Sequence, residues 1–259
     1  MTDLMSISDG VLEYTDMGTG APLVLLHGGT GDICEWGASV GYFARQYRVL
    51  VYNRRGYGNS TPRLDFPPTY HDADVADLLK FLDALGLNDP VRLCGFSDGA
   101  TIALMFAARF PSRVAALVLV AGHIYVEAKT QQGLLRAKRL FETGIQKKER
   151  DEAAHKIQGR RAWFDLWLDE QFRQWFNIED ALGKIRCPAL VVQGTEDEYA
   201  NVSQARRIAE GIPNAGLYLV AGAKHYIHGG DQTEGLWERV MAFLGDNSGG
   251  MGVERWWIT

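Results

Sequence analysis

Short runs of apolar residues recur along the chain, and polar or glycine-rich turns separate them. Runs without polar alternation are typical of strands that are buried on both faces of a parallel sheet. A looser alternation on both sides of Asp9-Gly10 predicts an opening β-hairpin, because this dipeptide favours a tight turn. With the two hairpin strands, the pattern predicts eight strands. The six apolar runs cover residues 22–26, 47–53, 91–94, 115–120, 188–192 and 217–220.

Stretches with apolar residues three or four positions apart lie between these runs and predict helices. In residues 74–85 this spacing places the apolar side chains on one face of a helix. Further helices are expected over residues 100–108, 202–209 and 236–244. Because strands and helices alternate, we expect an α/β fold, with a mostly parallel, twisted sheet that carries helices on both faces.

The regular alternation stops at Gly122, and a long charged, helix-prone stretch without a strand-like run follows. We therefore expect a helical cap insertion over residues 123–186, while residues 1–122 and 187–246 form the core. The tail, residues 247–259, shows no usable period. Six aromatic residues of the insertion are expected to pack it onto the core, with one or two lining a pocket. These residues are Trp163, Phe164, Trp167, Phe172, Trp175 and Phe176.

Composition narrows the classes of partner. The chain has 259 residues, of which 46% are hydrophobic, and this suffices for one large α/β domain with an insertion. A net charge of -5 provides no field that would attract nucleic acid or an anionic membrane. The N-terminus lacks a basic region followed by an apolar run, and no apolar stretch reaches membrane-spanning length. We expect a soluble, cytoplasmic monomer or homodimer, without nucleic-acid or membrane partners.

The strand at 91–94 leads into Gly95-Phe96-Ser97-Asp98-Gly99, which matches the G-x-S-x-G pattern. In this pattern a strand turns abruptly into a helix and leaves the serine hydroxyl exposed at the bend. The two glycines lack a Cβ that would clash where strand and helix nearly touch. The pentapeptide alone is weak evidence, but its strand and helix flanks make Ser97 a candidate nucleophile.

A second glycine-rich turn, His27-Gly28-Gly29-Thr30-Gly31, follows the strand at 22–26. Such a turn presents backbone N–H groups to an anion, which is either a phosphate or a transient oxyanion. Phosphate is disfavoured, because neither the P-loop Lys-Ser/Thr nor the G-x-G-x-x-G spacing is present. We expect His27 to order this turn by hydrogen bonding.

The chain resembles the serine hydrolase branch of the α/β-hydrolase fold over nearly its whole length. The candidate residues occur in the order Ser, Asp, His that this fold uses. Asn53 departs from the aspartate of many members, which is expected to alter local hydrogen bonding more than the triad. The resemblance rests on residues 27–29, 53–58, Ser97, Asp197 and His225.

Within this fold the chain is most similar to esterases of the valacyclovir hydrolase type, which act on amino-acid esters. This closer resemblance rests on residues 95–99 and 187–192 and on Lys224-His225. It implies an α/β-hydrolase sheet of eight strands and a reaction that needs no metal and no cofactor.

The resemblance also assigns the triad. A serine hydroxyl is a poor nucleophile at neutral pH, so an imidazole has to take its proton and a carboxylate has to orient that imidazole. His225 is the implied base and Asp197 the implied acid. Glu196 and Glu198 flank this acid as alternatives, and His228 is a rival base further into the loop.

The backbone N–H groups of Gly29 and Asp98 are implied to form an oxyanion hole, aided by the dipole of the elbow helix. The Asp98 side chain has two interpretations. It recognises a substrate amino group, as in the valacyclovir hydrolase type, or it only favours its helix N-terminus. Phe96, Trp163 and Trp167 are further candidate substrate contacts.

The sequence therefore predicts a cofactor-independent serine hydrolase that cleaves a small to medium carboxylic ester through an acyl-enzyme. One alternative is a C–C bond or enol-lactone hydrolase with the same triad. Another is a non-catalytic protein that binds a small ligand on the same fold.

Overall fold

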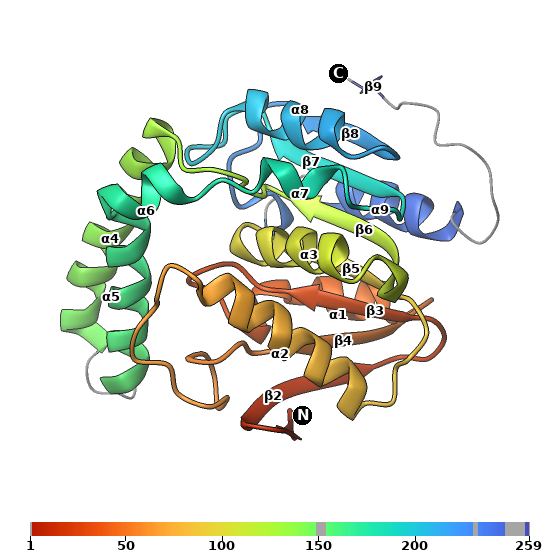
Figure 1. Ribbon diagram of the computed structural model, residues 1–259, viewed down its shortest axis with the longest axis horizontal. Helices are drawn as coiled ribbons and strands as arrows, with labels where there is room; N and C mark the ends of the chain where they lie inside the picture. Colours follow the sequence, from red (N-terminus) through yellow and green to blue (C-terminus); the bar gives the residue numbers. More distant parts are fainter. Residues whose placement is uncertain (1, 149–153, 230–232, 247–256, 259) are drawn as a thin grey trace.

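One sheet runs through the molecule, and most of its strands are parallel (Figure 1). The computed structural model describes residues 2–148, 154–229, 233–246 and 257–258. In the order β1-β2-β4-β3-β5-β6-β7-β8-β9, the pairs β1–β2 and β2–β4 are antiparallel and the others are parallel. The strands are β1 Asp3–Ile7, β2 Gly10–Met17, β3 Pro22–Leu26, β4 Arg48–Tyr52, β5 Val91–Phe96, β6 Val114–Val120, β7 Ala189–Gly194, β8 Ala215–Val220 and β9 Trp257–Ile258.

The eight predicted strands are present, and the expected α/β class is confirmed. The predicted opening hairpin is present, but Ile7 pairs with Gly10, so its turn is Ser8-Asp9, one residue before the predicted Asp9-Gly10. The tail, for which the pattern predicts no element, adds the two-residue strand β9 beside β8. A strand this short is too brief to give a period, and an open sheet edge supplies its hydrogen-bonding partners. The rest of the tail lies outside the described residues.

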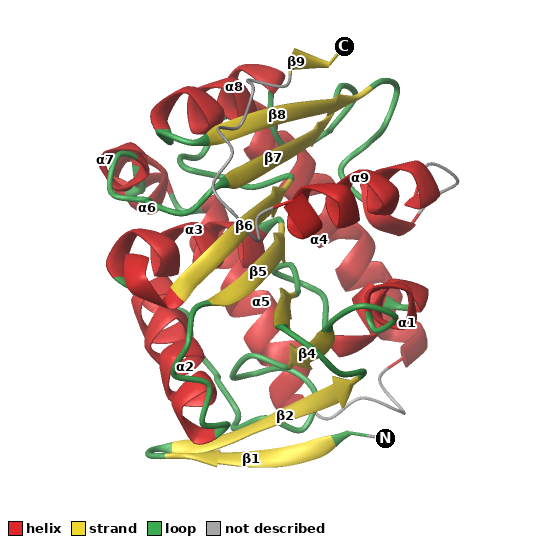
Figure 2. Cartoon of the chain, turned by 90° about the vertical axis from the view of Figure 1, so that its right-hand side faces the viewer, coloured by secondary structure: helices red, strands yellow, loops and turns green. Residues whose placement is uncertain are grey.

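Helices cover both faces of the sheet, with α1 and α9 on one face and α2, α3 and α8 on the other (Figure 2). Side chains along β3 alternate between these faces: Leu23 and Leu25 enter the core with α1 and α9, and Val24 and Leu26 enter the opposite core. The strand is therefore apolar at every position. The helices are α1 Ala38–Phe43, α2 Tyr70–Ala84, α3 Asp98–Arg109, α4 Ala128–Lys148, α5 Ala154–Leu168, α6 Glu170–Trp175, α7 Glu179–Leu182, α8 Val202–Gly211 and α9 Thr233–Asp246.

Helices α4 to α7 occupy the interval between β6 and β7, and Figure 1 shows α4 and α5 side by side at one end of the sheet. Five of the six aromatic residues that are expected to pack onto the core join a buried cluster with Tyr57 and Tyr70. The expectation is wrong for Trp175, which is 60% exposed. Phe172 in the short helix α6 and Phe176, the residue that caps its C-terminus, already take the buried positions. Among the described residues, no helix is both long and apolar enough to cross a bilayer.

Asn53 connects strand β2 to the turn at Ile33. Its Nδ2 donates to Oε2 of the buried Glu13 at 2.7 Å, and its Oδ1 accepts from the N–H of Ile33 at 2.8 Å. Glu13 also accepts two hydrogen bonds from Asn59. An aspartate at position 53 would face the Glu13 carboxylate, so the asparagine suits its surroundings. Because these contacts of Asn53 are made with Glu13 and Ile33 and not with the candidate triad, they support the expectation of a local effect, which stays a prediction.

Candidate active site

Ser97 lies in the abrupt turn between β5 and α3, with φ 53° and ψ -119°. An L-residue is strained in this left-handed region, and such strain is often found at functional sites. A Cβ at Gly95 would collide with the Gly99 carbonyl, and one at Gly99 would collide with the Leu26 carbonyl. Only glycines therefore allow α3 to approach the sheet this closely, and the predicted strand–turn–helix is confirmed.

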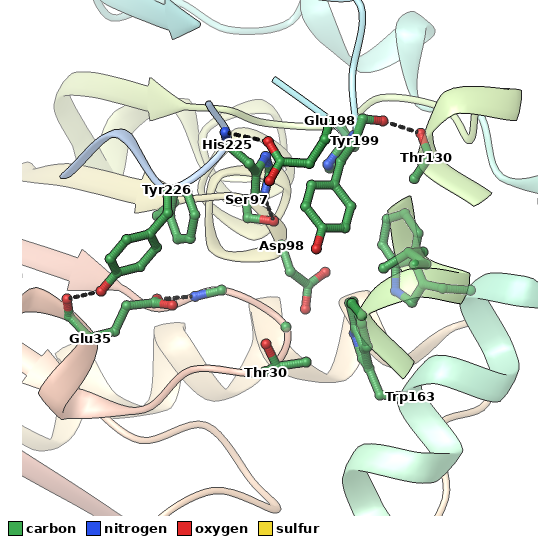
Figure 3. Close-up of a pocket in the computed structure, with 17 residues that line it drawn as sticks. Thr30, Glu35, Ser97, Asp98, Thr130, Trp163, Glu198, Tyr199, His225 and Tyr226 are labelled. Carbon is green, nitrogen blue, oxygen red and sulfur yellow. Dashed lines mark hydrogen bonds between the residues drawn. The ribbon is translucent and has the colours of Figure 1, made fainter. Parts of the chain in front are cut away.

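Three side chains from the ends of three strands meet at this turn, and Figure 3 shows two of them, Ser97 and His225. His225 Nε2 lies 2.9 Å from Ser97 Oγ, and His225 Nδ1 lies 2.7 Å from Asp197 Oδ2. Ser97 follows β5, Asp197 follows β7 and His225 follows β8. Because parallel strands end at the same edge of the sheet, residues 128 positions apart come into contact. The arrangement can move a proton from a hydroxyl to an imidazole that faces a carboxylate.

Asp197 is fully buried, and three further donors hold its carboxylate. Gln193 Nε2 donates to Oδ2 at 2.7 Å, and the N–H groups of Tyr199 and Ala200 donate to Oδ1 at 2.7 and 3.0 Å. Burial alone would raise the pKa of this carboxyl, but His225 and the hydrogen bonds outweigh burial and lower the pKa to about 2. Asp197 is therefore ionised at neutral pH. Its Oδ2 accepts a hydrogen bond from the N–H at Nδ1 of His225.

The rival residues lie elsewhere. Glu196 is exposed, and Glu198 accepts a hydrogen bond from the backbone N–H of His225 at 3.0 Å rather than from its ring. The ring of His228 is buried among aromatic side chains, and neither of its nitrogens has a hydrogen-bond partner in the described part of the chain. The structure brings His225, and not His228, to hydrogen-bonding distance of Ser97.

The turn that follows β3 is ordered by His27, as the sequence predicts. Its Nδ1 donates to the Gly28 carbonyl at 2.8 Å, and its Nε2 accepts from the N–H of Arg54 at 3.1 Å. Gly29 and Asp98 both line the pocket beside Ser97. The backbone N–H groups of Gly29 and Asp98 donate no hydrogen bond to any of the described residues. Two such donors can stabilise an oxyanion, and each is worth about 3 kcal/mol in comparable sites.

These groups line a pocket of about 270 Å³ (Figure 3). Helices α4 and α5 supply the wall opposite the strand ends. Phe96, Trp163 and Trp167, the candidate substrate contacts, are all lining residues. A side chain at Gly29 would collide with the Trp163 indole, so α5 lies directly against the turn.

A family model described as the alpha/beta hydrolase fold matches residues 21–173, which is more than half of the chain. The chain belongs to the α/β hydrolase fold family. The match starts at the run that forms β3 and extends through the elbow into α6. It therefore includes both glycine-rich turns of the site.

This α/β hydrolase is similar to several named enzymes. Serine hydrolase BPHL of Homo sapiens is 27% identical over 228 residues, which are 84% of this chain and 77% of that one. This similarity confirms the resemblance to the valacyclovir hydrolase type. The 2-hydroxy-6-oxononadienedioate/2-hydroxy-6-oxononatrienedioate hydrolase 1 of Dechloromonas aromatica is 26% identical over 245 residues, 83% of this chain and 84% of that one. The solved enol-lactonase from Burkholderia xenovorans LB400 shares the fold, with a TM-score of 0.76, 20% identity and coverage of 94% and 100%.

The Asp98 side chain of this hydrolase is 1% exposed and accepts hydrogen bonds from three residues. Arg54 Nη1 donates to Oδ2 at 2.8 Å, while the Tyr70 hydroxyl and His71 Nε2 donate to Oδ1 at 2.6 and 2.8 Å. Burial would raise the pKa of this carboxyl, but Arg54 and His71 outweigh burial and hold it well below its usual range. Recognition of a substrate amino group by Asp98 stays a prediction, and these contacts disfavour it, since the ammonium group would have to displace Arg54.

Sequence reasoning missed Arg54. Its guanidinium is buried, and besides Asp98 it donates to Asp74 at 2.9 Å and to the Gly28 carbonyl at 2.8 Å. It therefore holds the turn that precedes Gly29. The one available signal is its position directly after a buried strand, because polar residues at such strand ends often belong to a site.

Tyr70 is a second missed residue. Its hydroxyl donates to Asp98 and accepts from the indole N–H groups of Trp163 and Trp167, at 3.3 and 2.8 Å. Both lone pairs and the proton of the hydroxyl are thus in use. The hydroxyl connects α5 to the residue that follows the candidate nucleophile.

We expect His228→Phe to reduce the acid sensitivity of the fold. Burial lowers the pKa of His228 to about 3, so below pH 6.5 the unfolded chain binds a proton that the folded chain does not. The free energy of unfolding therefore falls with decreasing pH, by about 2 kcal/mol for one such group at pH 5. Urea unfolding at pH 7.5 and at pH 5 measures this fall in the free energy of unfolding. The fall should be about 2 kcal/mol smaller in His228→Phe than in wild type. His155→Phe, at a partly exposed position of α5, is the control, and a wild-type pH dependence in His228→Phe would contradict the prediction.

Proposed function

We propose that this hydrolase is a serine hydrolase that cleaves a small to medium carboxylic ester, without a cofactor, through an acyl-enzyme. The observation that carries the proposal is the hydrogen-bonded series Ser97 Oγ, His225, Asp197 beside the N–H groups of Gly29 and Asp98. In this proposal residues 123–186 act as the cap of the pocket.

Each step follows from what these groups can do. Ser97 Oγ attacks the ester carbonyl carbon while His225 Nε2 takes its proton, and the negative charge that develops on the carbonyl oxygen faces the N–H groups of Gly29 and Asp98. The C–O bond to the alcohol then breaks, and the alcohol leaves with the proton from Nε2. A water molecule, deprotonated by the same nitrogen, attacks the acyl-enzyme and releases the acid. Asp197 stays ionised and stabilises the imidazolium.

The charge of the pocket favours an ester over the substrates of C–C hydrolases. The Dechloromonas relative acts, by its name, on dioates, which carry two carboxylates. Glu35 and Glu198 line the pocket here, the third acidic lining residue, Asp98, is paired with Arg54, and no lysine or arginine is among the described lining residues. A dianion would meet like charge in this pocket, whereas a neutral or cationic ester, including an amino-acid ester, would not.

The test is labelling with a fluorophosphonate, read by intact mass, followed by a substrate panel. We expect one adduct per chain on Ser97, no adduct on the Ser97→Ala variant, and hydrolysis of p-nitrophenyl and aminoacyl esters. Turnover of a vinylogous diketone without ester hydrolysis would favour C–C cleavage instead. Folded wild type that stays unlabelled and inactive would favour a ligand-binding protein.

A further inference from the structure

The pocket holds a carboxylate that the proposed reaction does not use. Of its three acidic lining residues, Asp98 is neutralised by Arg54, and Glu198 is tied to the backbone N–H of His225. Glu35, in the turn that follows Gly31, is the third. In Figure 3 it lies on the side of Ser97 that is opposite to Trp163.

The Glu35 carboxylate is held in place but is only half satisfied. Its Oε2 accepts from the N–H of Gly28 at 2.6 Å, and its Oε1 accepts no hydrogen bond from the described residues. A Cβ at Gly31 would collide with the carboxyl group, so glycine leaves the space that Glu35 occupies. The backbone thus fixes one oxygen and leaves the other for a ligand.

Two aromatic rings accompany this carboxylate. An added Cβ at Gly28 would lie 3.2 Å from the Phe96 ring and 3.5 Å from Glu35 Oε1, so ring and carboxylate share one corner of the pocket. The Tyr226 hydroxyl donates to the Glu35 carbonyl at 3.0 Å, and the Tyr226 and Phe96 rings meet edge to face at 5.7 Å. A carboxylate with aromatic rings beside it is a combination that can recognise an ammonium group.

We propose that Glu35, with the rings of Phe96 and Tyr226, forms a subsite for a positively charged ammonium group of the substrate. This inference rests on the proposed ester hydrolysis and assigns its specificity. It places cation recognition on the turn that precedes α1 rather than on Asp98, whose acceptor oxygens are already occupied. A neutral ester of the same shape would fit the pocket without this attraction.

The ionisation of Glu35 gives the subsite a pH dependence. Burial raises the pKa of Glu35 to about 7, against the lowering influence of the Gly28 N–H, Arg54 and His225, while Asp32 adds to the rise. Tyr226 faces the same corner and is uncharged when protonated. Since only the ionised carboxylate attracts a cation, preference for the ammonium group rises from pH 6 to pH 8.

The experiment compares pairs of isosteric esters that differ only in the charge of one group. Acetylcholine is paired with 3,3-dimethylbutyl acetate, and the p-nitrophenyl ester of betaine with that of 3,3-dimethylbutyric acid, so the charge sits on the alcohol or on the acyl side. We expect wild type to hydrolyse the charged member of at least one pair with the higher kcat/KM. In Glu35→Gln, which keeps an acceptor for Gly28, this ratio should fall about tenfold, as for the loss of one partly buried ion pair.

Glu198→Gln is the matched control, because it removes the other unneutralised pocket carboxylate and also keeps an acceptor for a backbone N–H. It should retain the charged-to-neutral ratio of wild type. Ester turnover by wild type without charge preference, a ratio that is flat between pH 6 and 8, or equal losses in both variants would overturn the subsite. Absence of labelling and of all turnover would instead contradict the proposed function.

Discussion

Asp197→Asn lowers kcat/KM for ester hydrolysis by about 10⁴-fold, the factor expected when the imidazole of a triad is held in the wrong tautomer. The asparagine Oδ1 can still accept from the N–H groups of Tyr199 and Ala200, which now donate to the carboxylate. Its amide nitrogen then faces His225 Nδ1 and donates to it, so the ring proton moves to Nε2. An Nε2 that carries a proton cannot take another from Ser97.

Steady-state kinetics on the best ester of the panel measures this loss, and urea unfolding verifies that the variant is folded. Glu196→Gln is the matched control, since it makes the same chemical change one residue away on an exposed side chain. It should keep wild-type activity. If Glu196→Gln or Glu198→Gln instead lost most of its activity while Asp197→Asn stayed near wild type, the acid of the triad would be that glutamate and not Asp197.

Arg54→Met lowers the free energy of unfolding by about 3–5 kcal/mol, because it leaves buried carboxylates without their cation. Arg54 and both of its carboxylate partners, Asp74 and Asp98, are 1% exposed. Arg63 remains beside Asp74 at 2.7 Å, but no other cationic side chain pairs with Asp98 in the described structure unless His71 is protonated. Denaturant unfolding by circular dichroism measures the change.

Arg48→Met is the control for this experiment. Arg48 also pairs with an aspartate, Asp16, through three hydrogen bonds, but the two side chains are 32% and 28% exposed. Solvent screens such a pair, so its removal should cost at most about 1 kcal/mol. An equal decrease in the free energy of unfolding in the two variants would contradict the prediction. It would show that the buried ion pairs of Arg54 stabilise the fold no more than the exposed pair of Arg48.

The predictable parts of this molecule are those whose signal is local. The run at 115–120 is apolar at every position because β6 is buried on both faces, and no knowledge of its neighbours is needed. Ser97 is visible because the elbow needs glycines on both sides of it. His225 and Asp197 lack such a local signal, and the order of motifs in the fold supplied them.

The features that the sequence did not predict depend on contacts between residues that are distant in the chain. Arg54 lies in a polar turn that indicates solvent exposure, yet it is buried because α2 and α3 bring Asp74 and Asp98 against it. Glu35 enters the pocket because the turn at Gly28 folds back onto its carboxylate. Burial of a charge is a property of the assembled fold, so hydrophobic patterning does not reveal it.

The Tyr70 hydroxyl constrains how the substrate range of this hydrolase can diversify. The hydroxyl donates a hydrogen bond to Asp98 and accepts hydrogen bonds from the indole N–H groups of Trp163 and Trp167. A lineage that replaces either tryptophan to reshape the pocket leaves a buried acceptor unpaired next to the nucleophile turn. Positions 70, 163 and 167 are therefore expected to covary among homologues. Libraries for directed evolution should randomise all three together, since a single replacement leaves the Tyr70 hydroxyl with an unpaired acceptor site and lowers stability.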